Sequence, residues 1–309
     1  MSIPALKTTS EVLAGRDLSG RIVLITGGTT GIGKETARAL AAAGATVVIT
    51  ARSEEKGALA VTELLELVPE ADISFEVLEL GSLESVRAFT DRFAANHDRL
   101  DILVANAGIM AVPFGHTDDG FELQFGTNHL GHFVLVGRLL PLLASSAPAR
   151  IVMLSSGGHA ASDIVWDDPN FESRDYTKLE AYGQSKTANV LHAVELDRRY
   201  RDLGVRAWSV HPGMVKTDLG RHFTSDDYAE LVERAKQSGG ELPRRVGVDV
   251  GAATSVWAAT TDEALACGGG YLADCGAAKA KDWATDPESA RRLWSLSEEL
   301  VGESFPEPE

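Results

Sequence analysis

The stretch that decides the fold is "RIVLITGGTTGIGKETA", residues 21–37. A short apolar run passes directly into a glycine-rich turn, and a helical pattern follows the turn. Such a turn lets backbone N–H groups and a helix N-terminus meet a pyrophosphate, because side chains would block that approach. The glycines at 27, 31 and 33 alone are weak evidence, but their place between a first strand and a helix favours nucleotide binding.

The same alternation continues along the chain. Helical patterns such as "LESVRAFTDRFAANH" (83–97) separate β-rich apolar runs at 21–26, 46–51, 73–79, 101–106, 150–155 and 205–210. Near-continuous apolar strands between helices are typical of a parallel sheet covered on both faces. We therefore predict an α/β protein with a single-domain Rossmann fold, a doubly wound parallel sheet with helices on both faces.

The predicted Rossmann domain spans residues 20–276, between an N-terminal extension (1–19) and a C-terminal helical extension with a tail (277–309). Two polar segments, 157–177 and 218–246, interrupt the alternation after the fifth and sixth strands. Ligands of open α/β sheets bind outside the carboxyl ends of the strands, so we expect both segments to overhang the site as substrate loops. The final "GESFPEPE" (302–309) is expected to be a frayed tail.

Composition narrows the function classes. The 309 residues include 29 Lys and Arg against 45 Asp and Glu, a net charge of -16, which disfavours nucleic-acid binding. The N-terminus lacks a signal-peptide core and no run reaches the roughly 20 apolar residues of a spanning helix, so we expect a cytoplasmic protein without a membrane anchor. Cys267 and Cys275 are too few for a disulfide framework or a zinc site and are expected to be reduced.

A helical stretch, "EAYGQSKTANVL" (180–191), carries Tyr182 and Lys186 four residues apart. These positions are neighbours on a helix, so the ammonium could stabilise a phenolate and lower the phenol pKa from its usual value of roughly 10. Tyr182 would then act as a general acid near neutral pH. The alternative interpretation is a half-buried tyrosine beside a solvated lysine.

The end of the second strand predicts the cofactor. In "VVITARSEEKG" (47–57), Arg52 occupies the position where a carboxylate would normally bind the ribose 2′-hydroxyl of NAD. An arginine can bind a 2′-phosphate through two hydrogen bonds, and Lys34 or Lys56 could add charge nearby. NADP is therefore favoured, and NAD stays possible. The alternative is that Arg52 is a surface cation.

Three motifs in order are "TGGTTGIG" (26–33), "ANAG" (105–108) and the Tyr182–Lys186 helix, and with them the chain resembles the short-chain dehydrogenase/reductases. The resemblance is closest to the retinol-dehydrogenase-like branch and covers roughly residues 20–275. Its further markers are "PFGHTDDGFELQFGTNHLGHF" (113–133), "IVMLSSGGHAA" (151–161), "YGQSKTANVL" (182–191), "HPGMVKT" (211–217) and "GGGYLADC" (268–275).

The resemblance implies the catalytic set Asn128, Ser156, Tyr182 and Lys186. A hydride would pass between nicotinamide and a carbonyl carbon while Tyr182 exchanges the proton. Lys186 would lower the phenol pKa and hold the nicotinamide ribose, and Ser156 would hydrogen-bond the substrate oxygen. Asn128 would interrupt its helix and keep a water for proton transfer. The structural alternatives are a strand-end cap for Ser156 and a helix-terminus polar group for Asn128.

The resemblance also implies the residues in contact with the cofactor: Gly27, Thr29, Thr30, Gly31, Ile32, Gly33, Arg52, Glu79, Leu80, Asn106, Ala107, Gly108, Tyr182, Lys186, Pro212, Gly213, Val215 and Thr217. Two positions depart from the family pattern. Ala105 stands in place of a first asparagine, and Glu79 stands where an aspartate usually meets the adenine.

Several other residues suggest binding or packing roles. His129 and His132 have a spacing that could ligate a metal, but a third ligand is missing from the sequence nearby, so we expect packed histidines and no metal. His159 and His211 are expected to form hydrogen bonds near the site. An apolar pocket around the nicotinamide is expected from Met110, Val112, Phe114, Trp166, Phe171, Met214 and Phe223.

These expectations describe an NADP-dependent oxidoreductase acting on a bulky lipophilic ketone, aldehyde or alcohol. The alternatives are a non-catalytic cofactor-binding redox sensor or scaffold, and an epimerase or dehydratase. From the resemblance, we expect a homo-oligomer, a dimer or tetramer, formed through the helices that hold Asn128 and Tyr182.

Overall fold

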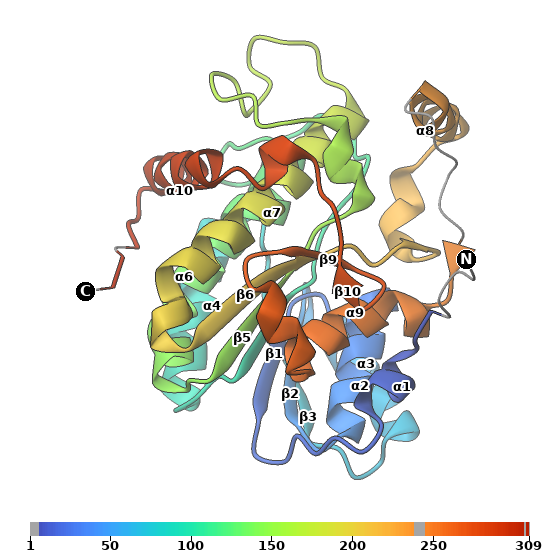
Figure 1. Cartoon of the computed structure of the whole chain (residues 1–309), viewed down its shortest axis with the longest axis vertical. Coiled ribbons are helices and arrows are strands. Elements are labelled where there is room, and N and C mark those ends of the chain that lie inside the picture. The colour runs from blue at the N-terminus through green and yellow to red at the C-terminus, as the bar shows by residue number, and fades with distance from the viewer. Residues whose placement is uncertain (1–5, 238–244, 306, 309) are drawn as a thin grey trace.

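The computed structural model describes residues 6–237, 245–305, 307 and 308, and for residues 234–237 the backbone alone. Residues 238–244 of the predicted loop 218–246, and the first five residues of the predicted N-terminal extension, lie outside this range. Figure 1 shows a central sheet between helical layers.

The central sheet has eight strands in the order β10-β9-β6-β5-β4-β1-β2-β3, and only β10 is antiparallel to its neighbour. The six predicted strands are confirmed as β1 (Ile22–Ile25), β2 (Thr46–Ala51), β3 (Ile73–Val77), β4 (Ile102–Ala105), β5 (Ala149–Leu154) and β6 (Val205–Val210). The sequence pattern did not indicate the short strands β9 (Tyr271–Ala273) and β10 (Gly276–Ala277), or the separate pair β7 (Met214–Val215) and β8 (Arg245–Val246).

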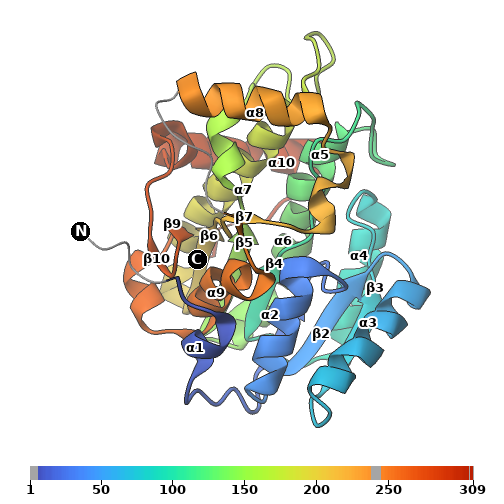
Figure 2. The same cartoon turned by 90° about the vertical axis from the view of Figure 1, so that its right-hand side faces the viewer.

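Helices cover both faces of the sheet, which confirms the doubly wound Rossmann fold (Figures 1 and 2). Alternate residues of β1 face opposite layers: Val23 and Ile25 belong to one buried cluster, and Leu24 belongs to the other. The first layer contains α1 (Thr9–Leu13), α2 (Gly31–Ala42), α3 (Glu54–Leu67) and α9 (Val248–Thr260). The second contains α4 (Leu83–Asn96), α6 (Gly131–Ser145), α7 (Lys178–Tyr200) and α10 (Pro287–Val301).

The strand order places a crevice at the centre of the sheet. From β1 the chain moves outward to β2 and β3, and then crosses back to β4 on the other side of β1. Ligands of open α/β sheets bind at this reversal of strand order, beyond the carboxyl ends of the strands. Figure 2 shows α8 (Ser225–Gln237) at one end of the molecule, apart from both helical layers.

The C-terminal residues contact the core, so the expectation of a frayed tail is wrong for residues 302–305. Gly302 ends α10 in a left-handed conformation with a φ of 65°. The Phe305 ring is 8% exposed and lies 5.5 Å from the Phe133 ring, and Glu303 forms ion pairs with Arg87 and Arg138. An apolar anchor beside paired charges keeps this segment against α4 and α6.

Candidate functional site

A cleft of about 2240 Å³ lies at the carboxyl ends of the parallel strands. Pockets for single small ligands usually measure roughly 300–1,000 Å³, so this cleft has room for a dinucleotide and a second molecule. Every residue of the expected cofactor set lines it, together with Ser156. The fourth expected catalytic residue, Asn128, is fully buried behind the wall.

The glycine turn between β1 and α2 forms one wall. Gly27 and Gly31 have φ values of 66° and 56°, which favour glycine. A Cβ on Gly33 would lie 2.4 Å from both the Gly27 carbonyl oxygen and Asn106 Nδ2. Asn106 Nδ2 donates to the carbonyls of Thr26 (2.8 Å) and Gly27 (3.2 Å) and so fixes the turn. The sequence motif therefore reflects a close approach of backbone to backbone.

The start of α2 suits a phosphate group. Side chains cap α3, α4, α7 and α10, since Ser53, Ser82, Thr177 and Asp286 each accept a backbone N–H. Thr30, at the start of α2, makes no such bond, and the first turn contains no acidic residue. The positive end of the helix dipole therefore faces the cleft without a side-chain acceptor, as a pyrophosphate requires.

The end of β2 provides positive charge at one end of the cleft. Arg52 and Lys56 both line the cleft and are exposed. Lys34 instead forms an ion pair with Glu63, so the additional charge expected near Arg52 comes from Lys56. Arg52 fits a 2′-phosphate by charge and planar shape.

Three of the four expected catalytic residues meet on the opposite wall. Thr177 caps α7 by accepting the N–H of Glu180, and the helix then turns Tyr182 and Lys186 inward, where they are 5% and 4% exposed. Lys186 Nζ donates to the Leu154 carbonyl at 2.8 Å and lies 5.7 Å from the centre of the Tyr182 ring.

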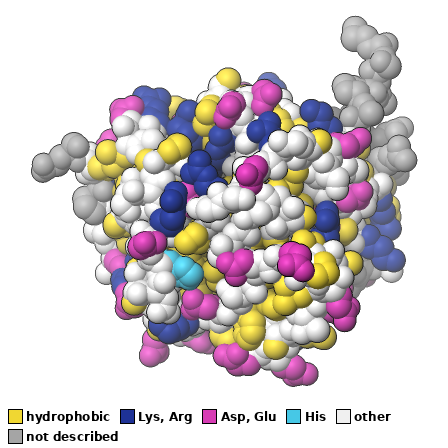
Figure 3. Space-filling view, turned by 90° about the horizontal axis from the view of Figure 1, so that it is seen from below, with side chains coloured by type: hydrophobic (Ala, Val, Ile, Leu, Met, Phe, Trp, Pro, Cys, Tyr) yellow, Lys and Arg dark blue, Asp and Glu magenta, His cyan; other side chains and the backbone are white. Residues whose placement is uncertain are grey.

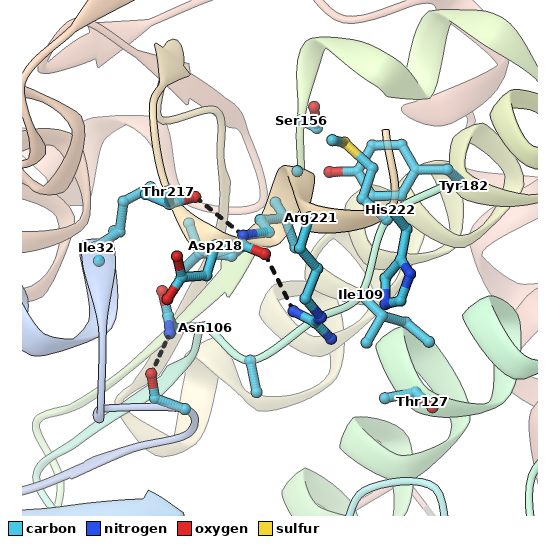
Figure 4. A pocket seen from close by; sticks show the side chains of 18 of the residues that line it. Ile32, Asn106, Ile109, Thr127, Ser156, Tyr182, Thr217, Asp218, Arg221 and His222 are labelled. Atoms are coloured by element: carbon cyan, nitrogen blue, oxygen red, sulfur yellow. Dashed lines mark hydrogen bonds between the residues drawn. The ribbon is translucent and has the colours of Figure 1, made fainter. Parts of the chain in front are cut away.

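Ser156, the second residue after the end of β5, lies on the same wall near Tyr182 (Figure 4). Its Oγ accepts the N–H of Gly158 at 3.0 Å. Gly158 is itself in close contact with the phenol ring, since a Cβ there would lie 2.8 Å from the ring of Tyr182. The glycine therefore allows the serine turn and the tyrosine to approach each other.

Burial dominates the ionisation of the central pair. It raises the pKa of Tyr182 to about 12, although a hydrogen bond with Ser156 acts in the opposite direction. Burial also lowers the pKa of Lys186 to about 7. The expected acidic phenol is therefore not a property of the protein alone, because loss of water disfavours both charged groups.

Asn128 joins two parts of the site. It lies in a π-helical turn, Gly126–Leu130, between α5 (Leu123–Phe125) and α6. Its Oδ1 accepts the N–H of Ile109 at 2.9 Å, and its Nδ2 donates to the Ile109 carbonyl and to Ser185 Oγ, both at 3.0 Å. The expected helix interruption is thus a π turn, a form often found at functional sites.

His132 has a structural role that its sequence motif did not indicate. Thr26 Oγ1 accepts the N–H of Ala107 at 2.9 Å and donates to His132 Nε2 at 2.9 Å. His132 Nδ1 then donates to the Asn128 carbonyl at 3.0 Å, and burial lowers the histidine pKa to about 4. A neutral histidine therefore connects the glycine turn to Asn128. The four-residue spacing between Asn128 and His132 was the sequence signal that could have indicated this contact.

The other three histidines for which a role was expected, His129, His159 and His211, behave as expected. His129 is packed, with its Nε2 2.8 Å from Ser297 Oγ of α10. His211 Nδ1 accepts the N–H of Gly157 at 3.0 Å. His159 Nδ1 donates to the Ser156 carbonyl at 2.7 Å, and its Nε2 accepts the N–H of Lys281 at 3.1 Å. His159 and His211 thus hold the segment that begins at Ser156.

The side of the cleft expected to hold the substrate is partly apolar. Met110, Val112, Met214 and Phe223 line it as expected, but Phe114, Trp166 and Phe171 do not. Trp166 and Phe171 instead lie under guanidinium groups of Arg292 and Arg174. The segment 157–177 contributes only its first residues, whereas 218–246 contributes much more: Asp218 to Ser225, Tyr228, Leu231 and Arg245.

Similarity to known proteins agrees with this geometry. The family model of the short chain dehydrogenases matches residues 21–228. Human retinol dehydrogenase 13 is 38% identical over 296 residues, which cover 94% of this chain and 87% of that protein. Within the described part of the chain, no helix is both long and apolar enough to cross a membrane.

Two solved structures are also similar. An uncharacterised protein of Mycobacterium paratuberculosis is 33% identical with a TM-score of 0.77, covering 98% of this chain and 100% of that one. The Pseudomonas aeruginosa RhlG/NADP complex is 28% identical with a TM-score of 0.63, covering 83% and 95%. These findings support an oxidoreductase of CH–OH or C=O groups with a nicotinamide cofactor. The chain belongs to the short-chain dehydrogenase/reductase family, in its retinol-dehydrogenase-like branch.

Proposed function

We propose that the protein is an NADP(H)-dependent oxidoreductase that interconverts a carbonyl and an alcohol group in a bulky lipophilic substrate, with Tyr182 as general acid and base. The observation that carries the proposal is the meeting of Tyr182, Lys186 and Ser156 in one cleft with the glycine turn. Arg52 favours NADP over NAD, because a guanidinium pairs well with a 2′-phosphate.

The cofactor would lie along the cleft with its pyrophosphate at the start of α2 and its 2′-phosphate near Arg52. When bound, the nicotinamide supplies or accepts the hydride. The backbone from Asn106 to Gly108 and the segment from Pro212 to Thr217 would hold its ribose and amide. The apolar residues beyond this segment would exclude water from the reacting carbonyl.

Proton transfer falls to Tyr182 of α7 and Ser156 of the turn after β5. In reduction, the Tyr182 hydroxyl donates its proton to the substrate oxygen while the Ser156 hydroxyl hydrogen-bonds the same oxygen. A phenol with a pKa near 12 is a weak acid at neutral pH, so further positive charge is needed beside it. The protonated Lys186 and the oxidised nicotinamide would provide that charge and favour the phenolate.

The test is NADPH consumption over a panel of ketones and aldehydes of increasing size. Tyr182→Phe should reduce kcat by about 10²–10⁴-fold, and NADPH affinity should hardly change. Tyr200→Phe is the matched control, because Tyr200 ends the same helix outside the cleft lining. Equal activity in the wild type and Tyr182→Phe would contradict the proton-transfer role.

A second outcome would favour the non-catalytic alternative. If the wild type binds NADPH tightly but consumes none with any compound in either direction, the proposal fails and a redox sensor or scaffold becomes the better description. NADH in place of NADPH completes the test of the cofactor: equal affinity for both would contradict the role of Arg52.

Assembly into a homo-oligomer and a cytoplasmic location stay predictions. The helices expected to pair are partly covered within the chain, since α10 packs against α7 and Phe305 lies against Phe133 of α6. A partner that used this face would meet the C-terminal residues first. Sedimentation of the full chain, with and without NADPH, measures the number of subunits.

A further inference from the structure

The cleft contains basic side chains that have no acidic partner. Most arginines in this acidic chain form ion pairs, for example Arg21 and Arg99 with Asp101. Among the arginines whose side chains the structure describes, four form none of these ion pairs: Arg52, Arg221, Arg245 and Arg292. All but Arg292 line the cleft. Unpaired arginines are therefore concentrated at one site.

The lysines show the same distribution. Among described side chains, the lysines outside those ion pairs are Lys7, Lys56, Lys186, Lys216 and Lys281, and all except Lys7 line the cleft. The acidic residues of the lining are Glu63, Glu79, Asp118 and Asp218. Two of these are engaged, since Glu63 pairs with Lys34 and Glu79 accepts the N–H of Gly81.

The cleft is therefore a positive region on a protein with a net charge of -16. In contrast, basic and acidic side chains are interspersed on the face seen in Figure 3. A hollow lined by charge of one sign concentrates ligands of the opposite sign. The cleft is thus suited to anions.

The bound cofactor accounts for only part of this charge. Arg52 and Lys56 follow β2, where the 2′-phosphate would bind, and the start of α2 would hold the pyrophosphate. A second group lies on the segments after β6 and in the C-terminal extension: Lys216, Arg221, Arg245 and Lys281. This second group has no cofactor phosphate assigned to it.

Arg221 is the best placed of the second group. It belongs to a 3-10 turn, Asp218–His222, which begins at Thr217, and Thr217 packs against Gly31 of the glycine turn. Arg221 Nη1 donates to the Asp218 carbonyl at 3.1 Å, rather than to its carboxylate. Figure 4 shows Arg221 and His222 extending into the pocket that also holds Tyr182 and Ile109. The remaining guanidinium N–H groups are available to a ligand.

Apolar side chains accompany this charge. Met110, Val112, Met214 and Phe223 line the same cleft. A neutral lipophilic substrate would use these residues but would leave the basic group without a partner. A lipophilic molecule with an anionic end would use both.

We propose that the substrate is a lipophilic carbonyl compound or alcohol with an acidic group, a carboxylate, at its far end, and that Arg221 binds this group. This inference rests on the proposed function. A planar guanidinium can bind a carboxylate through two charge-assisted hydrogen bonds. The carbonyl would then lie at Tyr182, and the apolar chain would lie between the two ends.

The first arm of the test compares an acid with its neutral ester. We would measure kcat/KM with NADPH for 10-oxodecanoate and its methyl ester, and for shorter and longer members of the series. The wild type should prefer the acid by about tenfold or more, and Arg221→Gln should lose about 10–100-fold on the acid, mainly through KM. The ester should be affected little. No preference in the wild type, or an unchanged preference in Arg221→Gln, would overturn the proposal.

A control removes the same charge elsewhere. Arg201 is 57% exposed and does not line the cleft, so Arg201→Gln should preserve the preference for the acid. Equal loss in both variants would show a general charge effect and would also overturn the assignment to Arg221.

The second arm separates the two sources of an anion. NADPH affinity is measured by the fluorescence of the bound cofactor. If Arg221→Gln weakens NADPH binding and lowers activity on acid and ester alike, Arg221 binds a cofactor phosphate, and the substrate proposal is wrong. Unchanged NADPH affinity with selective loss on the acid supports it.

A third arm does not depend on turnover. Decanoate should raise the melting temperature of the protein with bound NADP⁺ more than decanol does, and Arg221→Gln should abolish the difference. If no carbonyl compound is reduced but decanoate still stabilises the wild type selectively, the proposed function fails while the anion site stands. If decanoate has no selective effect, the anion site fails independently of the reaction.

Discussion

The two walls of the cleft are built differently. The nucleotide wall consists of the short turns after β1, β2 and β3 and of the start of the longer segment after β4. Its glycines touch neighbouring backbone: a Cβ on Gly33 would lie 2.4 Å from the Gly27 carbonyl oxygen. The substrate wall comes from the longer segment after β6, where a Cβ on Gly220 would meet no atom within 4 Å. Close packing thus constrains the first wall, while open space leaves the second free to vary with the substrate.

The largest expected effect is a difference in stability between two variants that each add one methyl group, one in each wall. Gly33→Ala should lower the free energy of unfolding by about 3 kcal/mol, because the clash involves a backbone carbonyl that cannot easily move. Gly220→Ala should change it by less than about 0.5 kcal/mol. Urea unfolding of both variants measures the difference, and NADPH affinity should fall only in Gly33→Ala. Similar stabilities for the two variants would remove the contrast between the walls.

The next-largest expected effect is on cofactor binding, which should depend on the nucleotide wall alone. Arg52→Gln should weaken NADPH binding by about 10–100-fold, the value of a lost charge-assisted pair, and should leave NADH binding almost unchanged. Arg221→Gln should show neither change, because it belongs to the substrate wall. Calorimetric titration of both variants with both cofactors measures this. Equal weakening of NADPH and NADH by Arg52→Gln would mean that Arg52 does not contact the 2′-phosphate.

The smallest expected effect is a loss of stability at low pH. His159 Nε2 accepts the N–H of Lys281, and burial lowers the pKa of His159 below its usual value. Below pH 6.5 the unfolded chain takes up the proton first, so the stability from neutral His159 is lost as the pH falls. Between pH 7.5 and 5.5, the free energy of unfolding of the wild type should fall by about 1 kcal/mol more than that of His159→Gln. The amide oxygen of the glutamine can accept the same N–H at any pH.

Urea unfolding at the two pH values measures this difference, and hydrogen exchange of the Lys281 amide locates it. The amide should lose protection at pH 5.5 in the wild type and keep it in the variant. The other buried histidines, such as His129 and His132, contribute to both proteins equally. An identical acid response in the two proteins would show that the contact between His159 and Lys281 does not stabilise the segment that begins at Ser156.

Much of the fold was predictable because the main strands carry a local signal. The six predicted strands are apolar runs long enough to show buried β structure. The strands β9 and β10 are only 3 and 2 residues long, so no periodic pattern could reveal them. The contact of Phe305 with α6 also escaped prediction, because one phenylalanine among polar residues gives no sign of which distant surface it will meet.

The site also has features that the sequence predicted and features that it did not. The identities of Tyr182, Lys186 and the glycines followed from motif and spacing, and all line the cleft. The effect of burial on the pKa of Tyr182, the bonds of Asn128 to Ile109, and the bridge made by His132 depend on residues far apart in the chain. Spacing along a helix does not determine how much water reaches a side chain.

The sequence by itself determined the alternating fold, the glycine turn and the residue types of the expected catalytic set, because each is encoded by neighbours within one strand, turn or helix. Only the tertiary structure decided which charges stay unpaired in the cleft, which aromatic residues line it, and how strongly its ionisable groups are dehydrated. Those properties depend on distances between segments that lie far apart in the chain, which local patterns do not contain.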